Sequence, residues 1–198
     1  MTELLNRFTR SVLSAVLLVS VVLSTGGCGV ALVTAATVLT IDVVRDRREP
    51  RTYWDDNKAE MDIRRAVANA DDIDDKNVSV TIWNGIVLLT GEVPSQRNID
   101  TILDIAKSHN HSRQVINRIE LAGRTNLTSR ANDSWLTARV KTAIAASGTL
   151  DATKLKVVTE RANVYLMGLV TTAEAAAAVD IVRTVPGVVR VIKVFEYI

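Results

Sequence analysis

One pattern of residues occurs twice in this chain, and the internal repeat limits the fold more than any other feature of the sequence. A shift of 77 residues places Leu89 on Leu166 and Gly91 on Gly168, and after a one-residue gap a shift of 76 continues the match. The repeat predicts two homologous modules. Each has only about 65 residues, a size at which a single hydrophobic core is marginal, so we expect the modules to support each other by docking.

The repeat and the changes in composition around it divide the chain into five segments. They are a signal peptide at 1–27, an apolar segment and charged tether at 28–54, a first module at 55–121, a polar linker at 122–131 and a second module at 132–198. The tether contains mixed charges and Pro50, which predicts a solvated stretch without a fold of its own.

Within each module the apolar residues predict the order helix, strand, strand, helix, strand. In the first module, residues at helical spacing precede Val78, Val80 and Ile82, which alternate as in a half-buried strand. Asn84-Gly85 then supplies the residues of a tight hairpin turn. The predicted fold class is therefore α+β, with two tandem αββαβ modules, each a three-stranded mixed sheet packed by two helices.

Two features of the second strands need comment. Gly91 and Gly168 fall on inward positions, where a residue without a side chain lets a helix cross the sheet closely, so we predict that both are structural glycines. In the second module Arg161-Ala162 stands in place of the favourable hairpin pair. Either Asn163 supplies the left-handed residue there, or the turn is wider.

The segment before the modules is the most apolar part of the chain. Arg7 and Arg10 precede an apolar run at 12–23, several small residues and the single cysteine, Cys28. This is the layout of a secretory signal peptide. The glycines around Cys28 interrupt the ~20 apolar residues that a membrane-spanning helix needs. The alternative is a signal anchor that uses the apolar residues 30–41 as part of its span.

The surroundings of Cys28 resemble the lipobox of bacterial lipoproteins, in which the cysteine after the cleavage site is acylated. Gly27 fits the position before the cysteine, whereas Thr25 departs from the usual aliphatic residue. Gly29 is not the aspartate that retains such proteins at the inner membrane. The resemblance implies that Cys28 carries palmitate or a similar chain and anchors the protein in the outer membrane, on its periplasmic face.

Two stretches, 86–93 and 164–170, are hydrophobic strands that run into a glycine, and they resemble BON domains. With the lipobox-like cysteine, the whole chain resembles the outer-membrane lipoproteins that contain two BON domains. The residues from Asn132 to Trp135 are similar to another characteristic stretch of that family. The resemblance implies phospholipid binding and support of envelope integrity, with a role in cell division, and no catalytic activity.

Charge is distributed unevenly between the modules. The formal net charge is +2, but residues 54–121 contain 8 basic and 12 acidic groups, whereas residues 122–198 contain 10 and 6. Anionic head groups attract basic surfaces, so we expect phosphatidylglycerol or cardiolipin to bind the second module. The near-neutral total argues against a dedicated nucleic-acid binder, and no nucleic-acid partner is predicted.

The first helix of the second module contains the candidate lipid site. Trp135, Arg139 and Thr142 share one face by their spacing, and Lys141 flanks it. Tryptophan is common at bilayer interfaces, and the residues before it are expected to cap the helix and leave N–H groups for a phosphate. The alternative is a core or interface role for Trp135. The predicted phospholipid-binding residues are Asn132, Asp133, Ser134, Trp135, Arg139, Lys141 and Thr142.

No catalytic site, metal site or cofactor is predicted. His109 and His111 lie in one short loop without a third ligand, so we expect a solvated loop. The acidic residues at 71–75 lack the glycine and distal glutamate of a calcium loop. No nucleophile, base and orienting group can be combined. The alternative to lipid binding is an adapter for envelope proteins, such as outer-membrane assembly or cell-wall remodelling factors.

Overall fold

The computed structural model describes residues 47–70, 73, 77–122 and 127–198, except for the side chains of 127 and 128. These residues belong to one compact unit, Arg45–Ile198. The signal peptide, Cys28 and the acidic residues at 71, 72, 74 and 75 lie outside the described residues. Within those that are described, no helix has both the length and the apolar character needed to cross a membrane.

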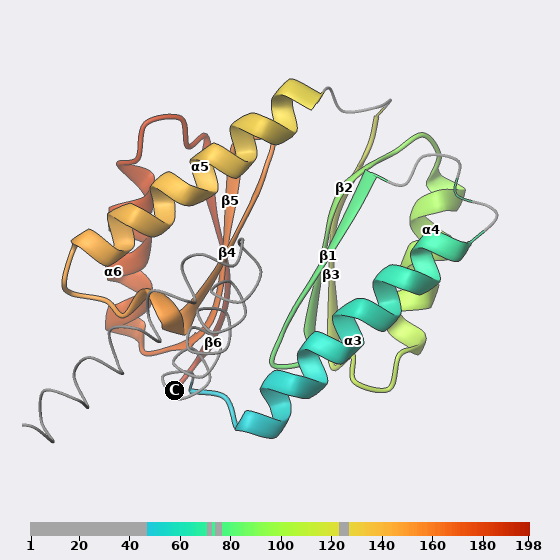
Figure 1. Ribbon diagram of the computed structural model, residues 1–198, viewed down its shortest axis with the longest axis horizontal. Helices are drawn as coiled ribbons and strands as arrows, with labels where there is room; N and C mark the ends of the chain where they lie inside the picture. Colours follow the sequence, from blue (N-terminus) through green and yellow to red (C-terminus); the bar gives the residue numbers. More distant parts are fainter. Residues whose placement is uncertain (1–46, 71–72, 74–76, 123–126) are drawn as a thin grey trace, which may run out of the picture. The chain divides into compact units, whose positions relative to one another are not determined.

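Both modules have the predicted order of elements, which confirms the α+β fold class (Figure 1). Module 1 consists of α3 (Pro50–Asn69), β1 (Asn77–Trp83), β2 (Ile86–Val93), α4 (Gln96–Ser108) and β3 (Gln114–Leu121). Module 2 consists of α5 (Leu127–Ala146), the 3-10 turn η1 (Ala152–Lys154), β4 (Leu155–Glu160), β5 (Asn163–Val170), α6 (Thr172–Arg183) and β6 (Arg190–Tyr197).

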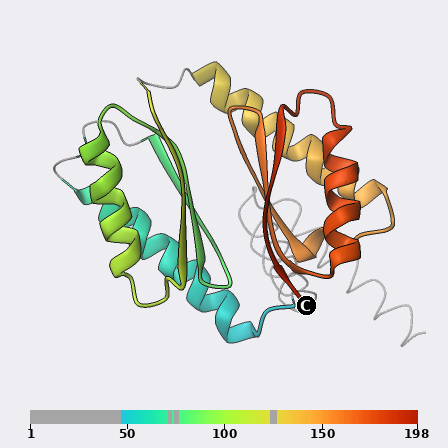
Figure 2. The same ribbon diagram turned by 180° about the vertical axis from the view of Figure 1, so that it is seen from behind.

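Each module has a three-stranded mixed sheet with its second strand in the middle. In module 1, β2 pairs antiparallel with β1 and parallel with β3, so that Leu89 lies opposite Val80 and Asn117. In module 2, β5 makes the same two pairings with β4 and β6. A parallel pair needs a long crossover, which α4 and α6 provide, and Figure 2 shows these helices packed on one face of the sheet of their own module.

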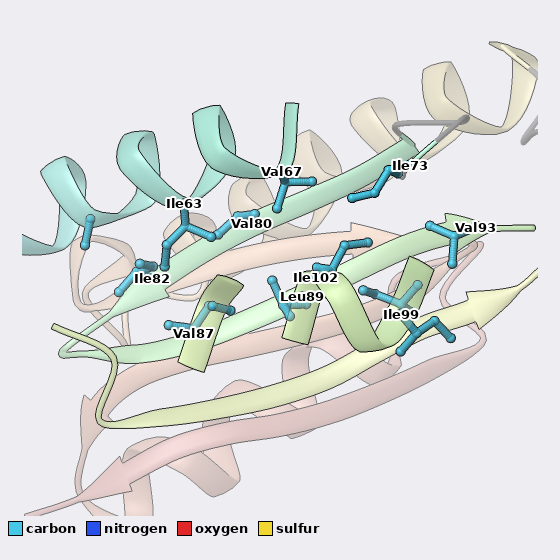
Figure 3. Packing of buried hydrophobic residues seen from close by; sticks show 13 residues of the cluster. Ile63, Val67, Ile73, Val80, Ile82, Val87, Leu89, Val93, Ile99 and Ile102 are labelled. Atoms are coloured by element: carbon cyan, nitrogen blue, oxygen red, sulfur yellow. The ribbon is translucent and has the colours of Figure 1, made fainter. Parts of the chain in front are cut away.

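The core of module 1 lies between one face of its sheet and the two helices (Figure 3). Ile63 and Val67 of α3 and Ile99 and Ile102 of α4 are at most 5% exposed and pack against Leu89 and its neighbours on the sheet. The predicted helical stripe and strand alternation are therefore confirmed for these residues. Module 2 repeats the arrangement with Leu136, Val140, Ile144, Leu166 and Val182.

The opposite face of each sheet is buried as well, which the expectation of half-buried strands missed. Every residue of β2 is buried. Its outward residues join a third apolar cluster to which both modules contribute, so the modules are docked as their small size led us to expect. The buried members of this shared cluster are Trp83, Ile86, Leu88, Tyr165, Met167 and Val194.

The two glycines of the second strands lie close to backbone, but not to one of the α-helices that cover the sheets. A Cβ added at Gly91 would lie 2.0 Å from the carbonyl oxygen of Asn77, and one at Gly168 would lie 2.7 Å from that of Lys154. Both oxygens belong to residues at or next to the start of the preceding strand. The predicted crossing helix is therefore wrong, because the close approach is within the sheet layer. Gly91 also has a φ of +119°, which side chains disfavour.

The hairpin turn of module 2 is as short as that of module 1. Arg161 and Ala162 have φ values of 48° and 60°, so both adopt the left-handed conformation of a two-residue turn. Asn163 is already the first residue of β5. The expectation that Asn163 supplies the left-handed residue, or that the turn is wider, is wrong.

A buried aspartate holds each of these turns. The carboxylate oxygens of Asp133 accept hydrogen bonds from the backbone N–H groups of Arg161 and Ala162, both at 2.9 Å. In module 1, the Asp56 carboxylate accepts from the N–H of Asn84 at 2.6 Å and from the next N–H at 2.9 Å. Two charge-assisted hydrogen bonds stabilise the left-handed turn, which explains how an Arg-Ala pair can occupy it.

The end of the charged tether is part of the folded unit. The α3 helix begins at Pro50, and the buried side chain of Arg48 contacts Asp56 at 2.6 Å while its Cζ lies 3.6 Å from the ring centroid of Trp83. Arg47 donates to both carboxylate oxygens of Glu174, at 2.6 and 2.8 Å. This hydrogen bonding, followed by the backbone N–H of Thr171, lowers the pKa of Glu174 to about 2. The expectation of a solvated stretch is wrong from Arg47 onward.

Candidate functional site

The candidate lipid residues of module 2 lie along α5, but its start differs from the prediction. The helix begins at Leu127, so Asn132, Asp133 and Ser134 lie inside it and do not cap it. Asp133 is 6% exposed and holds the hairpin turn. Asn132 is exposed, and the Ser134 hydroxyl donates to the carbonyl of Arg130 at 3.0 Å. The prediction that free backbone N–H groups lie at this point is therefore wrong.

A groove of about 460 Å³ opens between α5 and the loop that follows α6. Trp135 is 55% exposed at this groove. The alternative of a core role for Trp135 does not fit this exposure, because buried tryptophans are largely shielded from water. We call the groove between α5 and this loop the α5 groove. Its lining residues are Trp135, Ala138, Arg139, Thr142, Ala143, Ala146, Thr184, Val185 and Pro186.

Arg139 is held in place at the edge of the α5 groove. Its guanidinium carbon lies 4.5 Å from the ring centroid of Trp135, and one guanidinium nitrogen donates to the carbonyl oxygen of Pro186 at 3.2 Å. A cation stacked on an aromatic ring keeps its remaining N–H groups available. The groove therefore combines apolar walls with one positioned cation.

The structure separates the other predicted residues. Thr142 lines the groove, with its hydroxyl donating to the carbonyl of Ala138 at 2.9 Å. Lys141 is exposed but does not line the groove. At ~100° per residue, it lies roughly 120° around the helix from Trp135. Only Trp135, Arg139 and Thr142 of the predicted set meet in one groove.

The loop 184–186 forms one wall of the groove and was not predicted as part of the site. Its two apolar residues, Val185 and Pro186, come about 50 residues after the α5 residues that they face. No pattern in the sequence indicates that this loop lies next to the helix. The internal repeat did pair Asp56 with Asp133. An aspartate at the same position of both modules indicates a shared structural role, which is the contact with the hairpin turn.

The histidines of module 1 also differ from the expectation of a solvated loop. His111 is a quarter exposed, and its Nε2 lies 2.6 Å from Oδ1 of the buried Asp56. The backbone N–H of His111 donates to Nδ1 of His109 at 3.3 Å. In the part of the chain that the structure describes, no three His, Cys, Asp or Glu side chains are grouped so that they could hold a metal ion.

Sequence comparison identifies both modules. The BON domain matches residues 55–123 and 132–198. The chain is 35% identical over 173 residues to the outer membrane lipoprotein DolP of Haemophilus influenzae, a match that covers 87% of this chain and 89% of DolP. It is 31% identical over 125 residues to the 21 kDa hemolysin of Actinobacillus pleuropneumoniae, covering 63% and 64% of the two chains.

Among solved structures, the chain is similar to the C-terminal domain of CdsD, a structural protein of the type III secretion system of Chlamydia trachomatis. The identity is 12% and the TM-score 0.30, over 70% of this chain and 96% of that domain. The match to DolP confirms the outer-membrane localisation that the sequence predicted. With one BON domain in each module, the chain belongs to the BON-domain family.

Proposed function

We propose that this outer-membrane lipoprotein binds anionic phospholipid, such as phosphatidylglycerol or cardiolipin, through the α5 groove of module 2. The observation that carries the proposal is the exposed Trp135 ring with the Arg139 guanidinium stacked on it at 4.5 Å. An indole enters the boundary between head groups and acyl chains, and a guanidinium binds phosphate oxygens through several N–H groups.

The charge of the two modules supports this choice of surface. Module 2 and the linker before it contain 10 basic against 6 acidic residues. Attraction to an anionic bilayer contributes about 1 kcal/mol per well-placed Lys or Arg. The acidic module 1 is repelled by the same bilayer. Module 2 is therefore the part of the unit that anionic lipid should attract.

Vesicle binding by the soluble fragment 42–198, which contains the whole compact unit, tests the proposal. Trp135→Glu should reduce binding to vesicles with phosphatidylglycerol at least tenfold, because it removes the interfacial ring and adds a repelled charge. The matched control is Trp54→Glu, since Trp54 is 58% exposed on α3 of module 1. Undiminished binding by folded Trp135→Glu, or an equal loss from Trp54→Glu, would reject the α5 groove as the site.

Comparison of two basic residues on the same helix sharpens the test. Arg139→Ala should weaken binding more than Lys141→Ala, because Arg139 lines the groove and Lys141 does not. The residual binding of Arg139→Ala should also depend less on salt than that of the wild type. Equal losses would mean that general surface charge, and not the groove, attracts the lipid.

Acylation of Cys28 is the second part of the proposal and rests on the resemblance of residues 25–28 to a lipobox. The wild-type protein should incorporate labelled palmitate in cells, and Cys28→Ser should not. A labelled serine variant would show that the acyl chain is attached elsewhere. The family resemblance also leads us to propose that lipid binding supports envelope integrity, including at the division site.

A protein adapter is the second candidate function, and one observation favours it. Trp54 and Met61 lie seven residues apart on α3 and are 58% and 49% exposed. Seven residues are two helical turns, so the two side chains share a face that a partner protein could cover. An adapter should bind vesicles without regard to anionic lipid content, and Trp54→Glu should then impair function while Trp135→Glu does not.

A further inference from the structure

Module 1 has a polar pocket that overlaps in part with the position of the α5 groove in module 2, because the repeat places Lys58 on Trp135. The pocket has a volume of about 330 Å³ and lies between α3 and the loop that follows α4. The internal repeat equates the loop residues His109 and His111 with Val185 and Gly187 of module 2. The pocket thus has two titratable side chains where module 2 has a valine and a glycine. Its lining residues are Arg51, Asp55, Lys58, Ala59, His109, Asn110 and His111.

His111 is oriented by a buried carboxylate behind the pocket. Its Nε2 lies 2.6 Å from Oδ1 of Asp56, which is 2% exposed. Arg48 contacts the other oxygen of the same carboxylate at 2.6 Å, so Asp56 is itself fixed. Because the Asp56 carboxylate only accepts, Nε2 donates to it, and Nδ1 of His111 can donate to an anion only when the ring is doubly protonated. A donor held in this way loses little freedom when it binds.

Two cations on α3 complete the pocket. Arg51 and Lys58 are seven residues apart and therefore lie on the same side of the helix. Each contacts a carboxylate in an exposed pair, Arg51 with Asp55 at 3.6 Å and Lys58 with Asp62 at 2.7 Å. Exposed pairs of this kind are weak, so a bound anion can compete for both cations. Asp55 is the one carboxylate among the lining residues, and Asp62 beside the pocket contacts Lys58 and lies 3.8 Å from Nε2 of His109. A bound anion must therefore displace both carboxylates from their cations.

We propose that this pocket binds a phosphate-type oxyanion through Arg51, Lys58 and the doubly protonated ring of His111, whose Nδ1 then donates to the anion. A tetrahedral anion with several acceptor oxygens suits donors that approach from a helix on one side and a loop on the other. The site is separate from the α5 groove and lies on the module that we do not assign to bilayer contact. The phosphate can belong to a lipid head group or to a small soluble molecule, because both present the same oxygens.

Calorimetry on the full-length protein in neutral detergent micelles tests the site with inorganic phosphate as the probe and chloride at equal ionic strength as the control. Saturable phosphate binding is expected, and nitrogen-15 NMR should show shifts of the His111 ring. The variant Arg51→Gln/Lys58→Gln should weaken binding at least tenfold, and His111→Gln at least threefold. Lys107→Gln, an exposed change on α4 outside the pocket, should leave binding unchanged.

The outcomes separate the proposal from its alternatives. Both α3 side chains are exposed, Arg51 at 89% and Lys58 at 74%, so the double variant should fold even if His111→Gln does not. Absence of saturable phosphate binding, or full binding by the folded double variant, would overturn the proposal. Tighter binding of dihexanoyl phosphatidic acid than of inorganic phosphate would assign a lipid head group, and equal binding a soluble phosphate. Trp135→Glu should retain phosphate binding, which makes this result independent of the α5 groove.

Discussion

Asp56 and Asp133 occupy equivalent positions in the two modules, and each accepts hydrogen bonds from both N–H groups of a hairpin turn. The aspartate comes from the first helix and the turn from the first two strands. One carboxylate therefore fixes the helix to the sheet in each module. The two sites differ in their further contacts, because Asp56 also contacts Arg48 and His111.

The first prediction concerns this contact in module 2. Asp133→Ala should lower the free energy of unfolding by about 1–3 kcal/mol, because two N–H groups of the turn lose their acceptors. Urea denaturation measures the change. The control Asp180→Ala removes a carboxylate that is 63% exposed on α6, and it should have little effect. Equal stability of Asp133→Ala and the wild type would show that water replaces the carboxylate without cost.

The second prediction concerns the conformation of Ala162, which has a φ of +60°. A residue with a side chain is disfavoured there by about 1–2 kcal/mol, while glycine adds about 0.4–1 kcal/mol of unfolded-state entropy. Ala162→Gly should therefore stabilise the protein by up to about 1 kcal/mol. Ala176→Gly, at an exposed position inside α6, should destabilise it by about 1 kcal/mol. A loss of stability from Ala162→Gly would contradict the turn geometry.

The third prediction ranks three glycines by the space around them. Gly91→Ala should be the most damaging, because its Cβ would lie 2.0 Å from the carbonyl oxygen of Asn77 and its φ is unfavourable. Gly168→Ala should cost about 1–3 kcal/mol, since the nearest backbone oxygen is 2.7 Å away. Gly148→Ala has nothing within 4 Å and should cost at most about 1 kcal/mol, because the lower entropy of the unfolded alanine variant offsets part of the strain of its positive φ. Thermal melts of the three variants measure this order, and a different order would contradict the prediction.

The fourth prediction is a pH dependence caused by Glu160. Burial, followed by the charges of Asp133 and Glu92, raises the pKa of Glu160 from 4.5 to about 7. The folded state then retains a proton that the unfolded state releases, so the contribution of Glu160 to stability falls as pH rises from about 4.5 to about 7. Because the side chain is partly exposed, solvent screening limits the loss to about 1–2 kcal/mol.

Glu160→Gln removes this titration and serves as the measurement. The variant should be more stable relative to the wild type at pH 8 than at pH 5 in urea denaturation. The comparison cancels the contribution of the histidines, which both proteins share. The Asp180→Asn control, on an exposed carboxylate, should follow the wild type at both pH values. A constant difference between Glu160→Gln and the wild type would rule out a raised pKa in the folded state.

Periodicity predicted the parts of the fold that depend on one stretch of sequence. Alternation along β1 and β2 placed Val80 and Leu89 in the core correctly, because a strand with one face on its own helices shows that face locally. The burial of Leu88 on the opposite face could not be predicted, since it depends on Met167 of the other module. From the sequence alone, an apolar residue that is buried against the other module cannot be distinguished from an exposed one.

The candidate site divides in the same way. Helical spacing brought Trp135, Arg139 and Thr142 together, whereas Pro186 joins them through a contact between distant segments. Asp133 was misplaced for a different reason. Aspartate before an apolar stripe usually indicates a helix cap. Here α5 already begins at Leu127, and the carboxylate of Asp133 accepts hydrogen bonds from the hairpin turn.

The ion pairs of Arg47 and Arg48 determine how much chain lies between the proposed lipid anchor and the folded unit. At ~3.4 Å per extended residue, the chain from Cys28 to Arg47 can span at most about 65 Å, roughly 30 Å less than a chain that stayed free as far as Asp55. With Cys28 in the outer membrane, both arginines together set the greatest height above the bilayer at which the α5 groove can work. Loss of these two ion pairs would lengthen that reach without altering a single residue of the groove.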